Sequence, residues 1–198
     1  KNEGILTIQD SSSNGDGKVS GLRGVDNYGT LTLKSGIITT EDTTGSGGCV
    51  FMQADNASFV VEGGNVCPEA LSTAYSVSST TAGTGMCLTL LGGKIGKILL
   101  NGSNYTLTIG HQNGSDQDVE VGAITATTSN FVVGPRSYTL KLYSGTIDSL
   151  PTKNDSKITY EAVGALIKNV TEKTCPGGYK FESVGGGYRL VFGSCANP

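Results

Sequence analysis

The chain has 198 residues, a formal net charge of −3 and a charged fraction of 16%. This length fits one domain with a sizeable core, and the near balance of acids and bases gives no electrostatic footprint for nucleic acid or an anionic membrane. Glycine, serine and threonine make up 73 residues while 36% of the chain is hydrophobic, which favours an extracellular β-rich protein over a disordered chain.

The first predicted strand, residues 5–8, begins almost at the start of the chain. Because the sequence opens with Lys1 and no signal segment precedes this strand, we expect a fragment or a processed piece of a longer protein. Residues 28–38 then read Tyr-Gly-Thr-Leu-Thr-Leu-Lys-Ser-Gly-Ile-Ile. Three segments align with them without gaps, and a fourth is a degenerate copy: 56–66, 85–95, 137–147 and, degenerate, 118–124.

The copies share a period and an internal pattern. Apolar and mostly polar residues alternate within each copy, as expected of a strand with one buried face, and a glycine follows before a second apolar position. Each copy therefore predicts a strand, a bend and a second short strand, with like residues stacked about 4.8 Å apart in neighbouring coils. One equivalent position recurs in steps of 25, 28, 29, 29 and 23 residues at Ile8, Leu33, Val61, Leu90, Val119 and Leu142.

This shared period predicts an all-β fold, a single-stranded right-handed parallel β-helix of about six coils. A sandwich would place strands every 8–12 residues without such a period, and a leucine-rich repeat would need a fixed Asn or Cys that is missing here. We expect residues 1–172 to form the solenoid and 173–198 to form a C-terminal hairpin that caps it, turning at three glycines, 185–187. Short helical segments are predicted at 68–71 and 161–169.

The repeat Gly-Thr-Leu-Thr-Leu-x-x-Gly-x-Ile, followed by Pro-Gly-Gly-Tyr and Gly-Gly-Tyr-Arg-Leu-Val near the end, resembles the right-handed parallel β-helix proteins of the pectate-lyase-like superfamily. It is most similar to the repeat regions of bacterial cell-surface proteins. The resemblance spans residues 4–150 by repeat and 173–193 by hairpin, and it implies the fold more than a function. The superfamily includes lyases, hydrolases, adhesins and stalks.

Five cysteines lie at positions 49, 67, 87, 175 and 195. Cys175 and Cys195 flank the predicted hairpin almost symmetrically, so we expect a disulfide between them. Cys67 and Cys87 are a second potential pair, in which Cys49 could replace either partner, and one cysteine is left over. We expect no cofactor or metal ligand, since no Cys-x-x-Cys or Cys/His cluster is present.

Few residues indicate chemistry. Asp116 and Asp118 are two apart, so on a strand they would face the same side and could bind a cation or a sugar, although a solvated turn is the simpler explanation. Tyr138 and Tyr143 are candidates for stacking on a glycan. His111 lies in a stretch typical of an exposed loop, and residues 14–19 resemble the middle of a Ca²⁺ loop but favour a corner between strands.

These observations favour a non-enzymatic, adhesin-like or stalk module, secreted or on the cell surface, whose partners would be host or matrix glycans or proteins. A carbohydrate-active or glycan-binding β-helix is the alternative. Ice binding would need outward Thr-x-Thr pairs in every coil, and the predicted outward pairs are too irregular. No apolar run approaches the roughly 18 residues of a membrane span.

Overall fold

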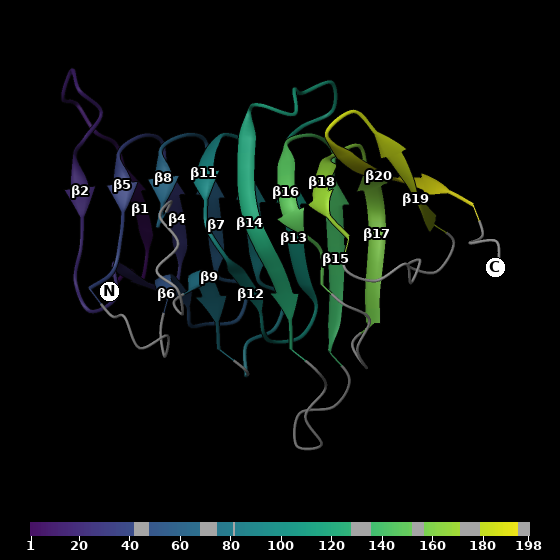
Figure 1. The fold of residues 1–198 in the computed structure, drawn as a ribbon. Coiled ribbons are helices and arrows are strands. Elements are labelled where there is room, and N and C mark those ends of the chain that lie inside the picture. Colours follow the sequence, from purple (N-terminus) through teal and green to yellow (C-terminus); the bar gives the residue numbers. More distant parts are fainter. Residues whose placement is uncertain are drawn as a thin grey trace.

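The computed structural model describes residues 1–41, 48–67, 75–80, 82–127, 136–151, 157–170 and 179–193. All regular secondary structure in these ranges is β-strand. The strands form parallel sheets that curl around a common core, a solenoid-like architecture compatible with a parallel β-helix (Figure 1). No helix in the described ranges is long and apolar enough to cross a membrane.

One wall of the solenoid is a seven-stranded parallel sheet through which the chain passes seven times. Its neighbouring strands are far apart in sequence because the rest of each coil lies between them. In spatial order they are β1 (Ile5–Ile8), β4 (Thr30–Leu33), β7 (Ser58–Val61), β10 (Cys87–Leu90), β13 (Tyr105–Ile109), β15 (Ser137–Leu142) and β17 (Lys157–Val163).

The second wall belongs to a thirteen-stranded sheet that ends in an antiparallel hairpin. Its path runs through β2 (Lys18–Val19), β5 (Ile37–Ile38), β8 (Asn65–Val66), β11 (Gly93–Ile95), β14 (Val119–Ala126), β16 (Thr146–Ser149), β18 (Leu166–Asn169), β20 (Gly187–Phe192) and β19 (Tyr179–Val184). A third wall branches from β14 and contains β12 (Ile98–Leu100), β9 (Tyr75–Ser79), β6 (Gly48–Met52) and β3 (Val25–Asn27).

The core consists of vertical ladders of like side chains. Leu33 pairs with Val61, and Val61 with Leu90, in parallel register, as the repeat predicts. All three side chains are fully buried. The four bend glycines that follow these strands have positive φ, between 80° and 94°, where a side chain would be strained: Gly36, Gly64, Gly93 and Gly145.

One rung of the predicted ladder is wrong. Val119 lies in β14, where the residue beside it is Gly93, so it belongs to the second wall. The partner of Leu90 is Ile109 in β13, which in turn pairs with Leu142. The sequence comparison missed this pass because Ile109 follows Leu90 by 19 residues instead of about 28.

The predicted helix at 161–169 is also wrong, because this segment contains the end of β17 and all of β18. Leu142 pairs with Val163, and Ile147 with Ile167. Pairing with the preceding coil therefore overrides the local helix propensity of Glu, Ala and Leu in this segment. The helical turn predicted at 68–71 lies outside the described residues.

Candidate functional site

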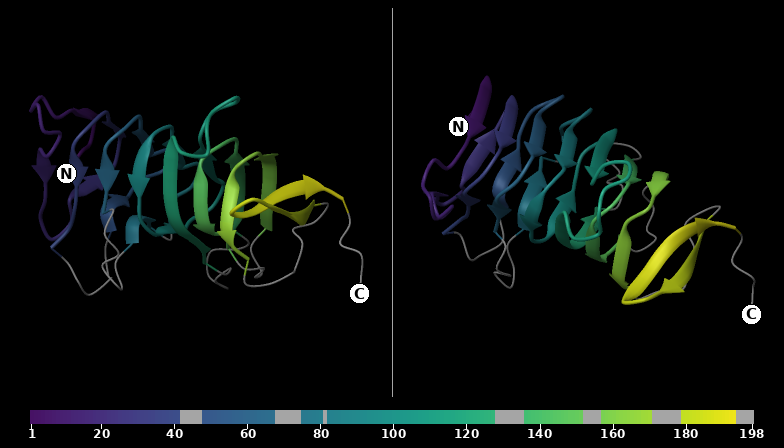
Figure 2. Two further views of the ribbon diagram at one scale, coloured as in Figure 1. Left: turned by 45° about the horizontal axis from the view of Figure 1, so that its top comes forward. Right: turned by 90° about the horizontal axis from the view of Figure 1, so that it is seen from above.

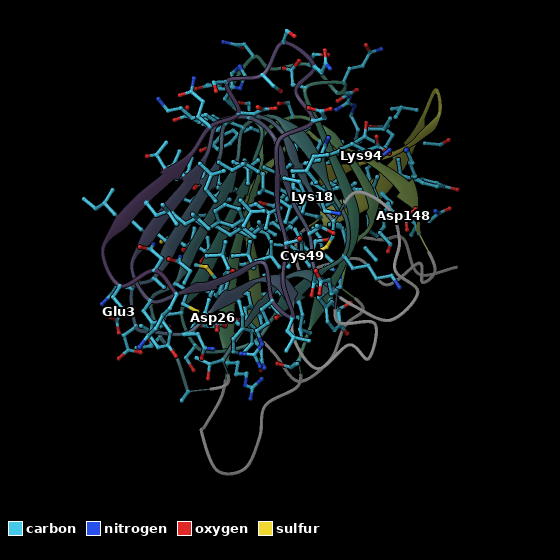
Figure 3. All side chains as sticks on the ribbon, turned by 90° about the vertical axis from the view of Figure 1, so that its left-hand side faces the viewer. Glu3, Lys18, Asp26, Cys49, Lys94 and Asp148 are labelled. Carbon is cyan, nitrogen blue, oxygen red and sulfur yellow. A yellow bond between two sulfur atoms is a disulfide. The ribbon has the colours of Figure 1, made fainter. Side chains whose placement is uncertain are left out.

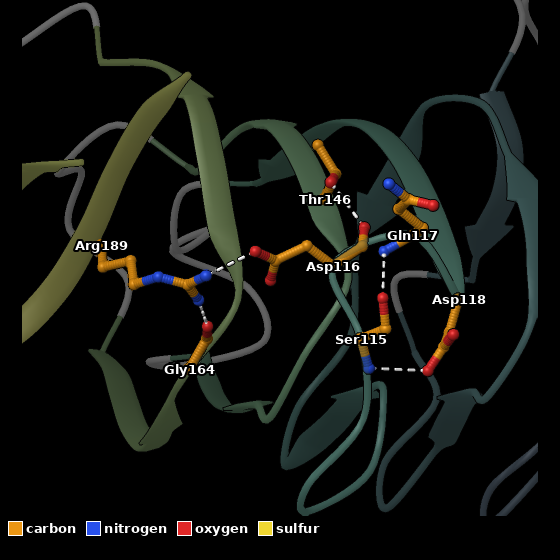
Figure 4. A network of polar contacts seen from close by, with 7 residues as sticks. All are labelled: Ser115, Asp116, Gln117, Asp118, Thr146, Gly164 and Arg189. Carbon is orange, nitrogen blue, oxygen red and sulfur yellow. Dashed lines mark hydrogen bonds and ion pairs between the residues drawn. The ribbon is translucent and has the colours of Figure 1, made fainter. Parts of the chain in front are cut away.

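Asp116 and Asp118 lie in the loop that leads into β14, within a turn instead of on a strand. The expectation that they share one face rested on strand geometry, and it does not apply here. Figure 4 shows the two carboxylates pointing away from each other. Asp116 forms an ion pair with Arg189 of β20, and Arg189 also donates a hydrogen bond to the carbonyl of Gly164. The structure thus joins this loop to the C-terminal hairpin.

Asp118 acts inside its own loop. Its Oδ2 accepts a hydrogen bond from the backbone N–H of Ser115 at 2.7 Å, and the hydroxyl of Ser115 accepts one from the N–H of Gln117 at 3.1 Å. The hydroxyl of Thr146 donates to the carbonyl of Asp116 at 2.7 Å. Both carboxylates therefore have intramolecular partners that fix the loop against β16 and β20 (Figure 4).

The two candidate tyrosines are separated by burial. Tyr138 is 1% exposed, and its phenol oxygen lies 3.4 Å from both the hydroxyl and the carbonyl oxygen of Thr127. Tyr143 is 38% exposed and follows the other end of β15. The structure does not gather the two tyrosines and the two aspartates at one point, and their role in ligand binding stays a prediction.

The outward face of the seven-stranded sheet carries regular rows of hydroxyl groups. One row contains Thr7, Thr32, Val60, Thr89, Thr108 and Lys141, each paired in register with the next. The second row contains Ile5, Thr30, Ser58, Cys87, Thr106, Thr139 and Thr159. The threonines and Ser58 in both rows are exposed or half-buried.

This face is more regular than the sequence predicted, because the missed strand β13 contributes Thr106 and Thr108. The missing signal was present in the chain: residues 105–107 and 138–140 are both Tyr-Thr-Leu. At the far end of the face, Lys141 and Glu161 form an ion pair at 2.9 Å. The hydrogen bond from this pair raises the pKa of Lys141 above its ordinary value.

A buried polar cluster lies inside the same wall. The guanidinium of Arg136 is almost fully buried and donates hydrogen bonds to Asn101 and Thr127. Tyr105 stacks in register on Tyr138, and burial raises the pKa of the Tyr105 phenol. Sequence reasoning missed this cluster because the three hydrogen-bonding residues come from different passes of the chain. It fixes one corner of the solenoid.

The structure contains a disulfide between Cys49 and Cys67, with a Cα–Cα distance of 6.3 Å. This was one of the pairings that the sequence left open, and it leaves Cys87 free and exposed. The predicted partners Cys175 and Cys195 lie outside the described residues.

The remaining candidates occupy loops. His111 is exposed, as predicted, and its backbone N–H donates to the Ser144 hydroxyl at 3.3 Å. Residues 14–17 form the corner between β1 and β2, where the carboxylate of Asp10 accepts the N–H of Gly17 at 2.8 Å. Within the described ranges, no three His, Cys, Asp or Glu side chains are grouped so that they could hold a metal ion. Comparison of the chain with protein-family models, curated proteins and solved structures gives no match.

Proposed function

We propose that the chain is a right-handed parallel β-helix of about six coils, closed at one end by its C-terminal hairpin. The seven passes through one sheet are separated by six steps, which supports this number of coils. The hairpin supports the cap, because β20 pairs antiparallel with β18 at the last pass and its Leu190 is buried in the core. A cap of this kind covers strand edges that would otherwise attract other strands.

The function we propose is a non-enzymatic, adhesin-like or stalk module that is secreted or displayed on a cell surface. The observation that carries this proposal is the outward face of the seven-stranded sheet, which runs the length of the solenoid and presents two rows rich in hydroxyl groups. An extended array of small polar groups suits contact with a long or repetitive partner surface. A buried pocket would suit a small ligand better.

The shape of the solenoid supports the stalk component. The first strands and the C-terminal hairpin lie at opposite ends (Figure 2). Six strand steps of about 4.8 Å give a rod roughly 29 Å long between the first and last passes. The Cys49–Cys67 disulfide favours an oxidising, extracellular compartment.

Binding to arrays of glycans and immobilised extracellular-matrix proteins tests the proposal. The decisive variant is Thr89→Asp with Thr108→Asp, which places two charges at the centre of the outward face. The matched control is Thr125→Asp, an exposed position of β14 on a different wall. We expect the double variant to lose at least tenfold in affinity for whichever partner the chain binds, and the control to bind as the unmodified chain does.

Three results would contradict the proposal. Cleavage of a polysaccharide by the purified chain would contradict a non-enzymatic role. Binding that the double variant leaves unchanged would place the partner elsewhere, and absence of binding across both arrays would remove the adhesin component. Sugar binding abolished by Tyr143→Ala but not by the double variant would favour the glycan-binding alternative, since Tyr143 is exposed.

A further inference from the structure

The first coil leaves the end of the hydrophobic core uncovered. This N-terminal coil, residues 4–27, contains β1, β2 and β3. Its inward residue Leu6 is 37% exposed, whereas the residues above it in the same ladder, Leu31 and Phe59, are fully buried. Leu22, beside β3, is 78% exposed. An end with apolar side chains open to water is a typical interaction surface.

The strands of this coil also have unused hydrogen-bonding edges. In the described part of the chain, β1 pairs only with β4, β2 only with β5 and β3 only with β6. Alternate N–H and C=O groups of an edge strand point away from its single neighbour and are available to another strand. All three walls end in this way at the same level of the solenoid.

The opposite end of the solenoid is different. There the hairpin packs on the last coil: the phenol of Tyr179 donates a hydrogen bond to the carbonyl of Tyr160 at 2.9 Å, and the two rings meet edge to face. Leu190 is 1% exposed. The contrast assigns the exposed apolar end to a contact that the isolated chain does not make.

We propose that the N-terminal coil is an interface for a second copy of this chain, and that two solenoids join end to end through a twofold axis. A twofold axis perpendicular to the solenoid reverses the direction of winding seen from one side, so every strand meets the partner copy antiparallel. With the axis through the centre of β1, β1 pairs with itself, and β2 of each copy pairs with β3 of the other.

The sequence of β1 fits this symmetry. Leu6 and Ile8 face inward on either side of the outward Thr7. An antiparallel register centred on Thr7 places Leu6 of each copy opposite Ile8 of the other. Both pairs then lie in the core, and the two copies of Thr7 meet on the outward face. One strand thus extends the core across the axis without changing its pattern.

Size and charge favour a second copy as the occupant. The coil spans residues 4–27, which matches the roughly 20–30 residues that each partner contributes to a standard interface. Charges of both signs lie around this end, as Figure 3 shows for Glu3, Lys18 and Asp26. Glu3 pairs with Lys1 at 2.5 Å, and Asp26 pairs with Arg23 at 3.1 Å. Two copies can therefore meet without net repulsion.

Sedimentation equilibrium of the 198-residue chain tests the proposal. We expect a species of twice the 20.3 kDa chain mass at micromolar to tens-of-micromolar concentration. Leu6→Lys should raise the dissociation constant at least tenfold, because each twofold contact would contain two lysines in its core. Thr89→Lys, in the middle of the outward face, is the matched control and should leave the dissociation constant unchanged.

Cross-linking provides a second test that does not depend on the Leu6 variant folding. Thr7→Cys, with every cysteine outside the Cys49–Cys67 disulfide replaced by serine, should form a covalent dimer on mild oxidation, since opposed residues of antiparallel strands meet the distance needed for a disulfide. Thr32→Cys, one coil further in on the same row, should stay monomeric.

Several outcomes would overturn the proposal. These are a monomer at all concentrations, a dimer that Leu6→Lys does not weaken, and equal cross-linking at positions 7 and 32. Burial of Leu6 by another segment or another protein, without dimerisation, would also overturn it. None of these measurements involves ligand binding, so the outcome is independent of the proposed adhesin function.

Discussion

Truncation of one central rung, Leu88→Ala, tests whether the ladders hold the solenoid together. Leu88 is fully buried in β10 and is stacked between Phe59 and Leu107, which are also fully buried. Removing a buried leucine side chain costs about 2–5 kcal/mol, and more where the surroundings cannot collapse. Backbone hydrogen bonds keep the neighbouring strands about 4.8 Å apart on both sides. We therefore expect a loss of about 3–5 kcal/mol.

Urea and thermal unfolding followed by circular dichroism measure this loss. For a chain of this length, about 2–4 °C per kcal/mol corresponds to a fall in Tm of roughly 6–20 °C. The matched control is Thr89→Ala in the same strand, whose half-exposed side chain faces outward. The control should change the free energy of unfolding by less than about 0.5 kcal/mol.

The refuting result is specific. If Leu88→Ala and Thr89→Ala lower the free energy of unfolding by similar small amounts, Leu88 is not in a packed ladder. If Thr89→Ala is the more damaging variant, the inward and outward faces of β10 have been exchanged, because a shift of one residue in register reverses every side chain.

Three further predictions follow from individual contacts. Replacing Cys49 and Cys67 with alanine should lower the free energy of unfolding by about 3 kcal/mol, because their disulfide closes a loop with a sequence separation of 18 residues; chemical unfolding with and without the bond measures it. Arg189→Gln should cost about 1 kcal/mol or less, since its ion pair with Asp116 is partly exposed, but hydrogen exchange should become faster in β20. Backbone and side-chain hydrogen bonds lower the pKa of Asp10 below its ordinary 3.8, so the loop is stabilised above that range and loses this support as pH falls through the lowered value; an NMR titration that finds the Asp10 pKa above 3.8 would contradict the contact.

Much of the first wall could be predicted from sequence because four of its strands belong to clear copies of one repeat. Their alternation and bend glycines are local signals, so Leu33, Val61 and Leu90 were placed correctly on one ladder. The pass at 105–109 was missed because a loop near His111 displaces the period. A period search tolerates substitutions within a copy better than changes in copy length.

The candidate site was less predictable because its contacts join distant residues. The pair Asp116–Arg189 is separated by 73 residues, and neither residue belongs to a motif that indicates the other. The choice of Cys67 as the partner of Cys49 likewise depends on how β6 and the end of β8 lie across one coil. Local patterns determine which residues face inward, whereas contacts between loops follow only from the completed winding.

The most direct test of the account measures how distance grows along one row of the outward face. Spin labels at Thr30 and Thr139, in a chain without other free cysteines, lie four strand steps apart, and labels at Thr30 and Thr159 lie five steps apart. Double electron–electron resonance should give distances near 19 Å and 24 Å, an increase of about one strand spacing. Distances that do not increase from the first pair to the second, or that exceed about twice these values, would contradict the stacking of successive passes on which the fold and both proposals depend.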